Sequence, residues 1–208
     1  MQIGGIVFDF DGTLIDSSER MYRLFDFLIP QNELAKDDYW ELKRNKISHE
    51  RLIRERYPNM SFKKFNEEWM RLIEDKQFLL YDKVFDDTKR TLLELSNVYD
   101  LFLLTARQKK LALQEELIEM ELFQFFKQIL VTEGNRTKTQ TWNQFVTDIS
   151  SAGKYIYVTD MGRDVLEAKE LGFFTIGITH GFMSRECLLQ YRPDYMIDNL
   201  NELLFLGV

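Results

Sequence analysis

Short apolar runs recur along the chain at the length of β-strands, and longer segments with helical periodicity separate them. The runs are rich in β-branched and aromatic residues and do not alternate cleanly between apolar and polar positions, which is typical of strands covered on both faces. They comprise Ile3–Phe10, Asp100–Thr105, Lys127–Thr132, Lys154–Asp160 and Phe173–Thr179, and Asp194–Asp198 is a sixth candidate. The pattern predicts a sheet that is buried on both sides.

The intervening segments have the apolar spacing of amphipathic helices. They comprise Asp87–Val98, Gln108–Leu122, Lys138–Ser150 and Arg163–Leu171, and Gly172 stands where a glycine commonly ends a helix. Strand and helix alternate at the spacing of right-handed βαβ units. We therefore expect an α/β fold in which a doubly wound, mostly parallel sheet carries helices on both faces.

Residues 16–82 interrupt this alternation with helical segments and no convincing strand. Apolar residues share one face of each of two helices, namely Leu24, Phe25, Leu28 and Ile29 in the first, and Phe62, Phe65, Trp69, Leu72 and Ile73 in the second. Pro30 and Pro58 mark the breaks. The pattern predicts a helical cap domain, residues 16–82, inserted into an α/β domain made of residues 1–15 and 83–208.

Composition and charge narrow the classes of function. The 208 residues are 45% hydrophobic and 29% charged, and no apolar stretch approaches the ~20 residues that span a bilayer. A net charge of -7 argues against nucleic-acid binding, because phosphate backbones are bound by positive surfaces. Cys187 is the lone cysteine and the N-terminus lacks a signal-peptide pattern. We expect a cytoplasmic monomer or homodimer that acts on small molecules, with no membrane partner.

Two carboxylates stand close together at the end of the first predicted strand. Asp9 and Asp11 would resist desolvation there unless a cation or several hydrogen bonds compensated their charge. Other polar residues stand at or just beyond the ends of later strands, namely Thr105, Lys138, Asp160 and Asp164. Because ligands of parallel α/β sheets bind beyond the carboxyl ends of the strands, we expect these side chains to converge on one crevice.

Carboxylates, a hydroxyl and an ammonium group around one crevice suit phosphoryl transfer, because a cation and a lysine stabilise the charge on phosphoryl oxygens. Mg²⁺ prefers one or two carboxylates and retained waters, and Asp9 with Asp160 could supply the carboxylates. Asp9 could then attack phosphorus, while Asp11 could protonate the departing alcohol and afterwards activate water. Gly12 permits the tight turn and close backbone approach that this geometry needs.

Four motifs resemble those of the haloacid dehalogenase-like (HAD) superfamily. They are "DFDGT" at Asp9–Thr13, Thr105 at a strand end, Lys138, and "DMGRD" at Asp160–Asp164. The continuation "LIDS" and the helical insertion behind it resemble the branch that includes phosphoglycolate phosphatases and β-phosphoglucomutases. The resemblance covers essentially the whole chain and implies a Rossmann-like HAD core with an inserted helical cap, and Mg²⁺ as the cofactor.

The resemblance also implies which residues handle the metal. Asp9 would be both the nucleophile and a metal ligand. Asp11 would be the general acid and base, and it would contribute its backbone carbonyl to the metal. Asp160 would bind Mg²⁺, and Asp164 would order the surroundings of the ion.

The remaining motif residues would bind the substrate. Thr105 and Lys138 would hold the phosphoryl oxygens, and we expect Gly12 and Ala106 to contact the substrate beside them. The segment Thr137–Thr139 departs from the family pattern, because it lacks the proline that often follows the lysine.

The predicted cap contains a basic run, Lys43–Arg56, within an acidic protein. One interpretation is a solvated helix face, which is common for charge runs. The other is that Asn45–His49, which resembles the substrate-specificity loop of caps in this branch, brings Lys46 or His49 over the site to contact the substrate. The sequence leaves both interpretations open.

The leading hypothesis is a Mg²⁺-dependent phosphatase that hydrolyses a small phosphorylated metabolite through an aspartyl-phosphate. The alternative is a phosphomutase, which returns the phosphoryl group to another sugar hydroxyl. A dehalogenase is disfavoured because it needs no second carboxylate such as Asp11, and a phosphonate-cleaving enzyme would need a cap lysine, for which Lys43 and Lys46 are candidates. A phospho-accepting receiver module is shorter and lacks a large helical insertion, and a non-catalytic binding protein would need an occluded site.

Overall fold

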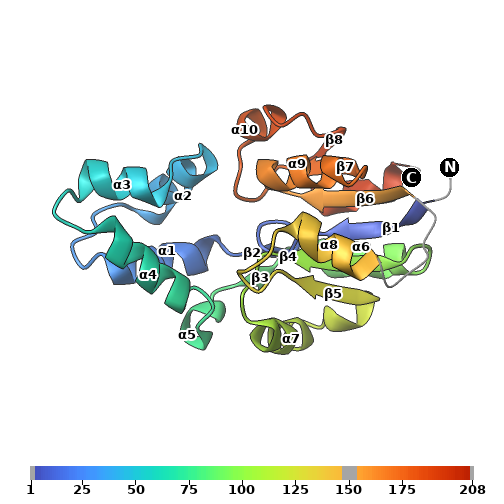
Figure 1. Ribbon diagram of the computed structural model, residues 1–208, viewed down its shortest axis with the longest axis horizontal. Helices are drawn as coiled ribbons and strands as arrows, with labels where there is room; N and C mark the ends of the chain where they lie inside the picture. The colour runs from blue at the N-terminus through green and yellow to red at the C-terminus, as the bar shows by residue number, and fades with distance from the viewer. Residues whose placement is uncertain (1–2, 147–153, 207–208) are drawn as a thin grey trace.

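A six-stranded parallel sheet forms the centre of the computed structural model, which describes residues 3–146 and 154–206 (Figure 1). The strands are β1 (Ile3–Phe8), β4 (Leu101–Thr105), β5 (Gln128–Val131), β6 (Lys154–Thr159), β7 (Phe174–Ile178) and β8 (Tyr195–Ile197). They lie in the order β5-β4-β1-β6-β7-β8, with each neighbouring pair parallel. The carboxyl ends of β1, β4 and β6 therefore meet at one edge of the sheet.

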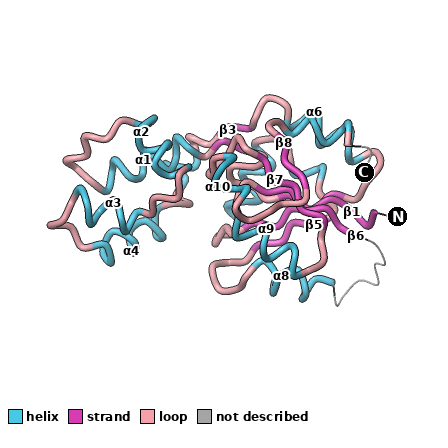
Figure 2. Tube along the Cα trace, turned by 90° about the horizontal axis from the view of Figure 1, so that it is seen from above, coloured by secondary structure: helices cyan, strands magenta, loops and turns pink. Residues whose placement is uncertain are grey.

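Helices cover both faces of the sheet (Figure 2). The helices outside the insertion are α6 (Thr88–Ser96), α7 (Lys110–Glu119), η1 (Phe123–Phe125), α8 (Lys138–Val146), α9 (Gly162–Glu170), α10 (Arg185–Leu189) and η2 (Leu200–Phe205). Leu92 of α6 and Leu117 of α7 belong to the same apolar cluster as Phe8, whereas Trp142 of α8 packs in another cluster with Val7. Adjacent residues of β1 thus point to opposite faces, and both faces are covered.

The doubly wound parallel sheet predicted from the sequence is confirmed. All six predicted strands are present, and their observed bounds lie within two residues of the predicted ones. The predicted helix Lys138–Ser150 begins at Lys138, and its last residues, 147–150, lie outside the described part of the chain. Gly172 follows α9 with a φ of +76°, the left-handed conformation that favours glycine at a helix end.

A helical insertion, which we call the cap, lies beside the sheet-containing part of the chain in Figure 1. It consists of α1 (Ser18–Leu28), α2 (Lys36–Arg44), α3 (His49–Arg56), α4 (Phe62–Leu72) and α5 (Lys76–Leu79). The cap has an apolar cluster of its own. Within it, the ring of Phe25 lies 4.8 Å from that of Tyr39 and 6.0 Å from that of Phe65. The predicted apolar faces of α1 and α4 therefore pack against each other inside the cap.

Two short antiparallel strands, β2 (Ile15–Asp16) and β3 (Lys83–Val84), frame the cap. Asp16 pairs with Lys83, so the chain enters and leaves the cap side by side. The sequence predicted no strand at either place, because a two-residue strand has no detectable periodicity. This ribbon connects the cap to the part of the chain that contains the sheet.

Side-chain caps fix the starts of several cap helices. Ser48 accepts the N–H of Arg51 at 3.1 Å, and Asp75 accepts the N–H of Gln77 at 3.2 Å. Each bond satisfies an amide that the first helical turn leaves without a partner. Within residues 3–146 and 154–206, no helix is long and apolar enough to cross a membrane.

Replacement of Phe25 by alanine should remove about 3–5 kcal/mol from the free energy of unfolding, because its ring is fully buried among the aromatic side chains of the cap. Phe27→Ala on the same helix is the matched control. Phe27 is 61% exposed and its ring has an edge contact with that of Phe78, so its loss should cost about 1 kcal/mol or less. Urea unfolding measures both values, and equal losses would contradict a packed cap core.

Candidate active site

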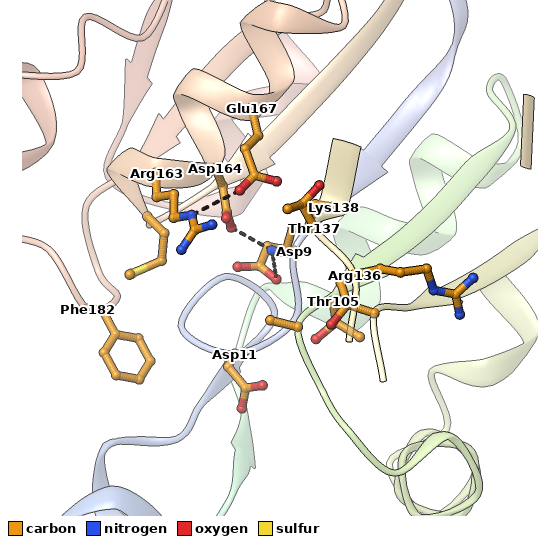
Figure 3. Close-up of a pocket in the computed structure, with 13 residues that line it drawn as sticks. Asp9, Asp11, Thr105, Arg136, Thr137, Lys138, Arg163, Asp164, Glu167 and Phe182 are labelled. Atoms are coloured by element: carbon orange, nitrogen blue, oxygen red, sulfur yellow. Dashed lines mark hydrogen bonds and ion pairs between the residues drawn. The ribbon is translucent and has the colours of Figure 1, made fainter. Parts of the chain in front are cut away.

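A cavity of about 360 Å³ opens at the carboxyl ends of β1, β4 and β6 (Figure 3). It is lined by Asp9, Asp11, Thr105, Ala106, Thr132, Arg136, Thr137, Lys138, Met161, Arg163, Asp164, Glu167 and Phe182. The topology thus brings together most of the residues that the sequence proposed for the site. It adds residues that the sequence did not propose, including Thr132, Arg136, Thr137 and Arg163.

Asp9 is held at the end of β1 by backbone and side-chain contacts. Its N–H donates to the carbonyl of Val158 at 2.9 Å, and its Oδ1 accepts the N–H of Phe10 at 2.8 Å. Lys138 Nζ, from the first residue of α8, lies 2.7 Å from Asp9 Oδ1 and 2.5 Å from Asp164 Oδ2. One ammonium group therefore contacts two buried carboxylates that belong to different elements (Figure 3).

The carboxylates of this buried cluster outnumber its ammonium group, and the pKa values of Asp9 and Lys138 are shifted accordingly. Burial raises the pKa of Asp9 well above its usual value; Lys138 opposes this effect, and the charges of Asp164 and Asp160 add to it. Burial by itself lowers the pKa of Lys138, but Asp164 and Asp9 outweigh burial and raise this pKa well above its usual value. Three carboxylates and one ammonium group share a buried site, so a cation would stabilise the ionised carboxylates.

Asp160 follows β6 and is fully buried. Its Oδ1 accepts a hydrogen bond from Thr13 Oγ1 at 3.1 Å, and its Oδ2 accepts the N–H of Phe182 at 2.6 Å. Burial raises the pKa of Asp160 to about 7 against the opposing effect of the Phe182 N–H. Gly12 lies behind this carboxylate rather than in the cavity wall: its φ is +77°, and a Cβ there would lie 2.1 Å from Asp160 Oδ2. Only glycine allows this close approach.

Thr105 ends β4 at the cavity, and Ala106 follows it in the wall. The Oγ1 of Thr105 accepts the N–H of Arg107 at 3.3 Å, so the hydroxyl proton is available for another acceptor. This position lets Thr105 donate to an anionic ligand in the cavity.

A buried ionic network surrounds Asp11. Arg107 Nε lies 2.7 Å from Asp11 Oδ2 and Arg107 Nη2 lies 2.9 Å from Oδ1, where Arg20 of α1 also donates. Asp82, just before β3, lies 3.1 Å from both Arg20 and Arg107. Glu116 of α7 lies 3.2 Å from Arg107. The network thus joins Asp11 in the cavity wall to helix α1 of the cap, to the residue that precedes β3, and to helix α7.

The network contains two guanidinium groups and three carboxylates. Burial raises the pKa of Asp11, but Arg107 and Arg20 outweigh it and hold this pKa below its usual range. For Asp82, burial dominates and raises the pKa to about 8, with Asp11 and Glu116 adding to burial and the two arginines opposing it. Asp11 is therefore ionised at neutral pH, and its carboxylate points away from Asp9 in Figure 3.

The sequence did not identify the partners of Asp11, which are Arg20, Asp82, Arg107 and Glu116. One signal for the network was present in the sequence. Glu116 shares a helical face with Leu113 and Leu117, and this spacing is the signal that a carboxylate enters the core with them. A buried carboxylate needs a partner, but sequence spacing does not say which residue supplies it.

Two expected substrate contacts do not lie at the cavity. Lys46 is exposed, and its Nζ donates to Gln190 Oε1 at 3.1 Å beside α10. His49 is turned into the aromatic cluster of the cap, where its Nε2 lies 2.9 Å from Tyr39 Oη and its ring lies 4.2 Å from that of Trp69. Burial, with a smaller effect of the Lys43 charge, lowers the pKa of His49 to about 2, so the ring is neutral. Lys46 therefore contacts the residue that follows α10, His49 contacts the core of the cap, and neither lines the cavity.

Comparison with known families agrees with the arrangement of these motifs. A family model described as haloacid dehalogenase-like hydrolase matches residues 6–178, which include every motif residue from Asp9 to Asp164. The chain belongs to the haloacid dehalogenase-like hydrolases. It is therefore an enzyme of the hydrolase class. A search of curated proteins finds no match to this HAD chain.

Solved structures share the HAD fold over nearly the whole chain. A haloacid dehalogenase-like family hydrolase from Streptococcus pneumoniae is 26% identical with a TM-score of 0.80, over 98% of this chain and 97% of the other. A predicted phosphoglycolate phosphatase from Haemophilus somnus is 17% identical with a TM-score of 0.78, over 100% and 99% of the two chains. A HAD hydrolase from Bacillus subtilis that is bound to magnesium is 20% identical with a TM-score of 0.69, over 100% of both. The last two likenesses establish the fold.

The acidic residues of the site fit the Mg²⁺ ion that HAD membership implies. Mg²⁺ retains several waters and needs only one or two protein carboxylates, a number that Asp9 and Asp160 could supply. Among the described residues, no group of three or more acidic, histidine or cysteine side chains is arranged to hold a metal ion, so an ion bound by Asp9 and Asp160 would need water for most of its other ligands. The unbalanced buried carboxylates supply the charge that favours the ion.

Asp82→Asn should flatten the pH dependence of stability. The pKa of Asp82 is raised to about 8 in the folded protein, so the folded state binds a proton that the unfolded state releases near pH 4. The stability that this proton contributes is present below about pH 4 and is lost as the pH rises to about 8. Asparagine cannot titrate, and the slope of the unfolding free energy should become shallower by up to about 1.4 kcal/mol per pH unit. Urea unfolding at pH 5 to 8 measures the slopes, and identical slopes would rule out a protonated Asp82.

Proposed function

We propose that this HAD hydrolase is a Mg²⁺-dependent phosphatase that releases phosphate from a small phosphorylated metabolite through an aspartyl-phosphate on Asp9. The observation that carries the proposal is the contact of Lys138 with Asp9 and Asp164 in a cavity that Thr105 also lines. A carboxylate, an ammonium group and a hydroxyl around one space suit the attack on a phosphoryl group whose oxygens need positive partners. The volume of about 360 Å³ suits a small molecule.

In the first step, Asp9 attacks the phosphorus. Its Oδ1 is engaged by Lys138 and by the N–H of Phe10, which leaves Oδ2 as the attacking oxygen. The bond between Oδ2 and phosphorus forms as the bond from phosphorus to the alcohol oxygen breaks. The alcohol takes a proton from Asp11, while Lys138 and Thr105 hold the other phosphoryl oxygens.

In the second step, water attacks the phosphorus of the aspartyl-phosphate. Asp11 takes the proton of the water, the bond from Asp9 to phosphorus breaks, and phosphate leaves. Arg107 and Arg20 keep Asp11 ionised, which is the form that this step requires. The first step requires a protonated Asp11, so this carboxylate must take up a proton from solvent, and its contacts with the two arginines must loosen, before the alcohol leaves.

Bound Mg²⁺ would supply positive charge beside the phosphoryl oxygens, held by the carboxylates of Asp9 and Asp160 and the carbonyl of Asp11. Asp164 would act through its contact with Lys138. Its Oδ2 accepts hydrogen bonds from Lys138 Nζ at 2.5 Å and from Thr159 Oγ1 at 3.2 Å. Asp164 therefore holds Lys138 in the direction of Asp9.

Asp9→Asn should lower the release of phosphate from 4-nitrophenyl phosphate by about three orders of magnitude or more, because the amide cannot form the ester with phosphorus. A chelator should abolish the wild-type activity, and added Mg²⁺ should restore it. Asp37→Asn on the exposed surface of the cap is the control and should keep full activity. Wild-type activity in Asp9→Asn would refute the proposed nucleophile, and phosphate as the product separates hydrolysis from transfer to a second sugar hydroxyl.

Asp11→Asn should slow alkyl phosphates far more than aryl phosphates. An alcohol needs a proton to leave, and loss of general acid catalysis costs about 10²–10⁴-fold, whereas 4-nitrophenolate leaves without a proton. The ratio of kcat/KM for 4-nitrophenyl phosphate to that for an alkyl phosphate should therefore rise. Comparison of two substrates on one variant cancels any loss of folded protein. An unchanged ratio would count against Asp11 as the general acid.

A further inference from the structure

The cap contributes no side chain to the described lining of the cavity, since every lining residue lies outside α1–α5. Its influence on the site must pass through residues that contact both. The loop from Thr179 to Ser184, after β7, is one such segment. Phe182 of this loop lines the cavity, and its ring lies 5.0 Å from that of Trp40 in α2.

Arg44, the last residue of α2, binds this loop at three points. Its Nη2 donates to the carbonyl of Thr179 at 2.8 Å, and its Nη1 donates to the carbonyl of Gly181 at 2.5 Å. Its own carbonyl accepts the N–H of Ser184 at 3.0 Å. The planar guanidinium group spans two carbonyls on either side of His180, which fixes the path of the loop relative to the cap.

The same loop determines how the carboxylate of Asp160 is held. The N–H of Phe182 donates to Asp160 Oδ2 at 2.6 Å. Gly181 packs so closely that a Cβ there would lie 2.2 Å from Asp160 Oδ2 and 2.3 Å from the carbonyl of Gly12. A displacement of the loop by a few tenths of an ångström would therefore turn or displace this carboxylate.

We propose that Arg44 is a positioning residue for Asp160, so that the docking of α2 on the loop and the binding of the divalent cation stabilise each other. The inference rests on the proposed role of Asp160 as a metal ligand. Mg²⁺ demands near-ideal octahedral geometry, and residues that orient metal ligands commonly change metal affinity by 10–100-fold when they are replaced. Coupling between two binding events is reciprocal, so the cation in turn favours the docked cap.

The sign of the effect separates positioning from simple electrostatics. The positive guanidinium group of Arg44 binds the carbonyl of Gly181, and Gly181 packs against Asp160. If charge alone mattered, removal of the guanidinium would relieve repulsion and strengthen Mg²⁺ binding. If Arg44 positions Asp160 through the loop, its removal weakens Mg²⁺ binding. The two mechanisms therefore predict opposite changes.

The test is the dissociation constant of Mg²⁺, measured by titration calorimetry on the metal-free full chain without substrate. In Arg44→Gln the dissociation constant should rise by about 10-fold or more. Arg44→Lys keeps the charge but cannot span both carbonyls, and it should also weaken binding. Gln190→Ala is the matched control, because it removes the hydrogen bond from Lys46 to Gln190 and leaves the loop from Thr179 to Ser184 untouched. Its Mg²⁺ affinity should stay within about twofold of the wild type.

Hydrogen exchange provides a readout independent of affinity. Mg²⁺ should slow amide exchange in the loop from Thr179 to Ser184 of the wild type, and it should do so less in Arg44→Gln. Unchanged or tighter Mg²⁺ binding in a folded Arg44→Gln, with the unfolding midpoint as the check on folding, would overturn the inference while leaving the phosphatase proposal intact. Wild-type affinity in Asp160→Asn would instead overturn the assignment of Asp160, and the inference with it.

Discussion

Buried negative charge at the carboxyl ends of β1 and β6 is the constraint on which the site depends. Asp9, Asp160 and Asp164 are all buried there, and Lys138 is the ammonium group that contacts two of them. Folding would not tolerate such a concentration of carboxylates without compensation. Lys138 and the donors around Asp160 compensate part of the charge, and what remains creates the environment that a divalent cation favours.

A second consequence of buried charge is the way in which the cap is attached. Charged side chains of the cap bind three separate segments that lie next to the cavity. Arg20 reaches Asp11, Arg44 reaches the loop after β7, and Glu74 accepts the N–H groups of Gln108 at 2.7 Å and Lys109 at 2.8 Å. Gln108 and Lys109 follow closely after Thr105, so each contact ends near a residue of the cavity. The cap can thus affect the site without entering it.

The fold was largely predictable because its elements have strong local signals. The central strands are continuous apolar runs, and the α/β alternation restricts how such strands can be ordered. The placement of Asp9, Asp11 and Asp160 at the carboxyl ends of strands was also predictable, because these residues directly follow the apolar runs. The short ribbon at Ile15–Asp16 and Lys83–Val84 was missed, since two residues carry no pattern and its pairing depends on the closure of the cap.

The amino-acid sequence by itself determined the strands, the helices, the apolar faces of the cap and the acidic residues at the strand ends, because periodicity and turn chemistry are local. Only the tertiary structure decided the partners of the charged side chains. Arg20 and Arg107 meet at Asp11 although 87 positions separate them, and His49 turns into the cap cluster instead of the cavity. Such pairings depend on distances across the folded chain, which the spacing of residues along the sequence does not contain.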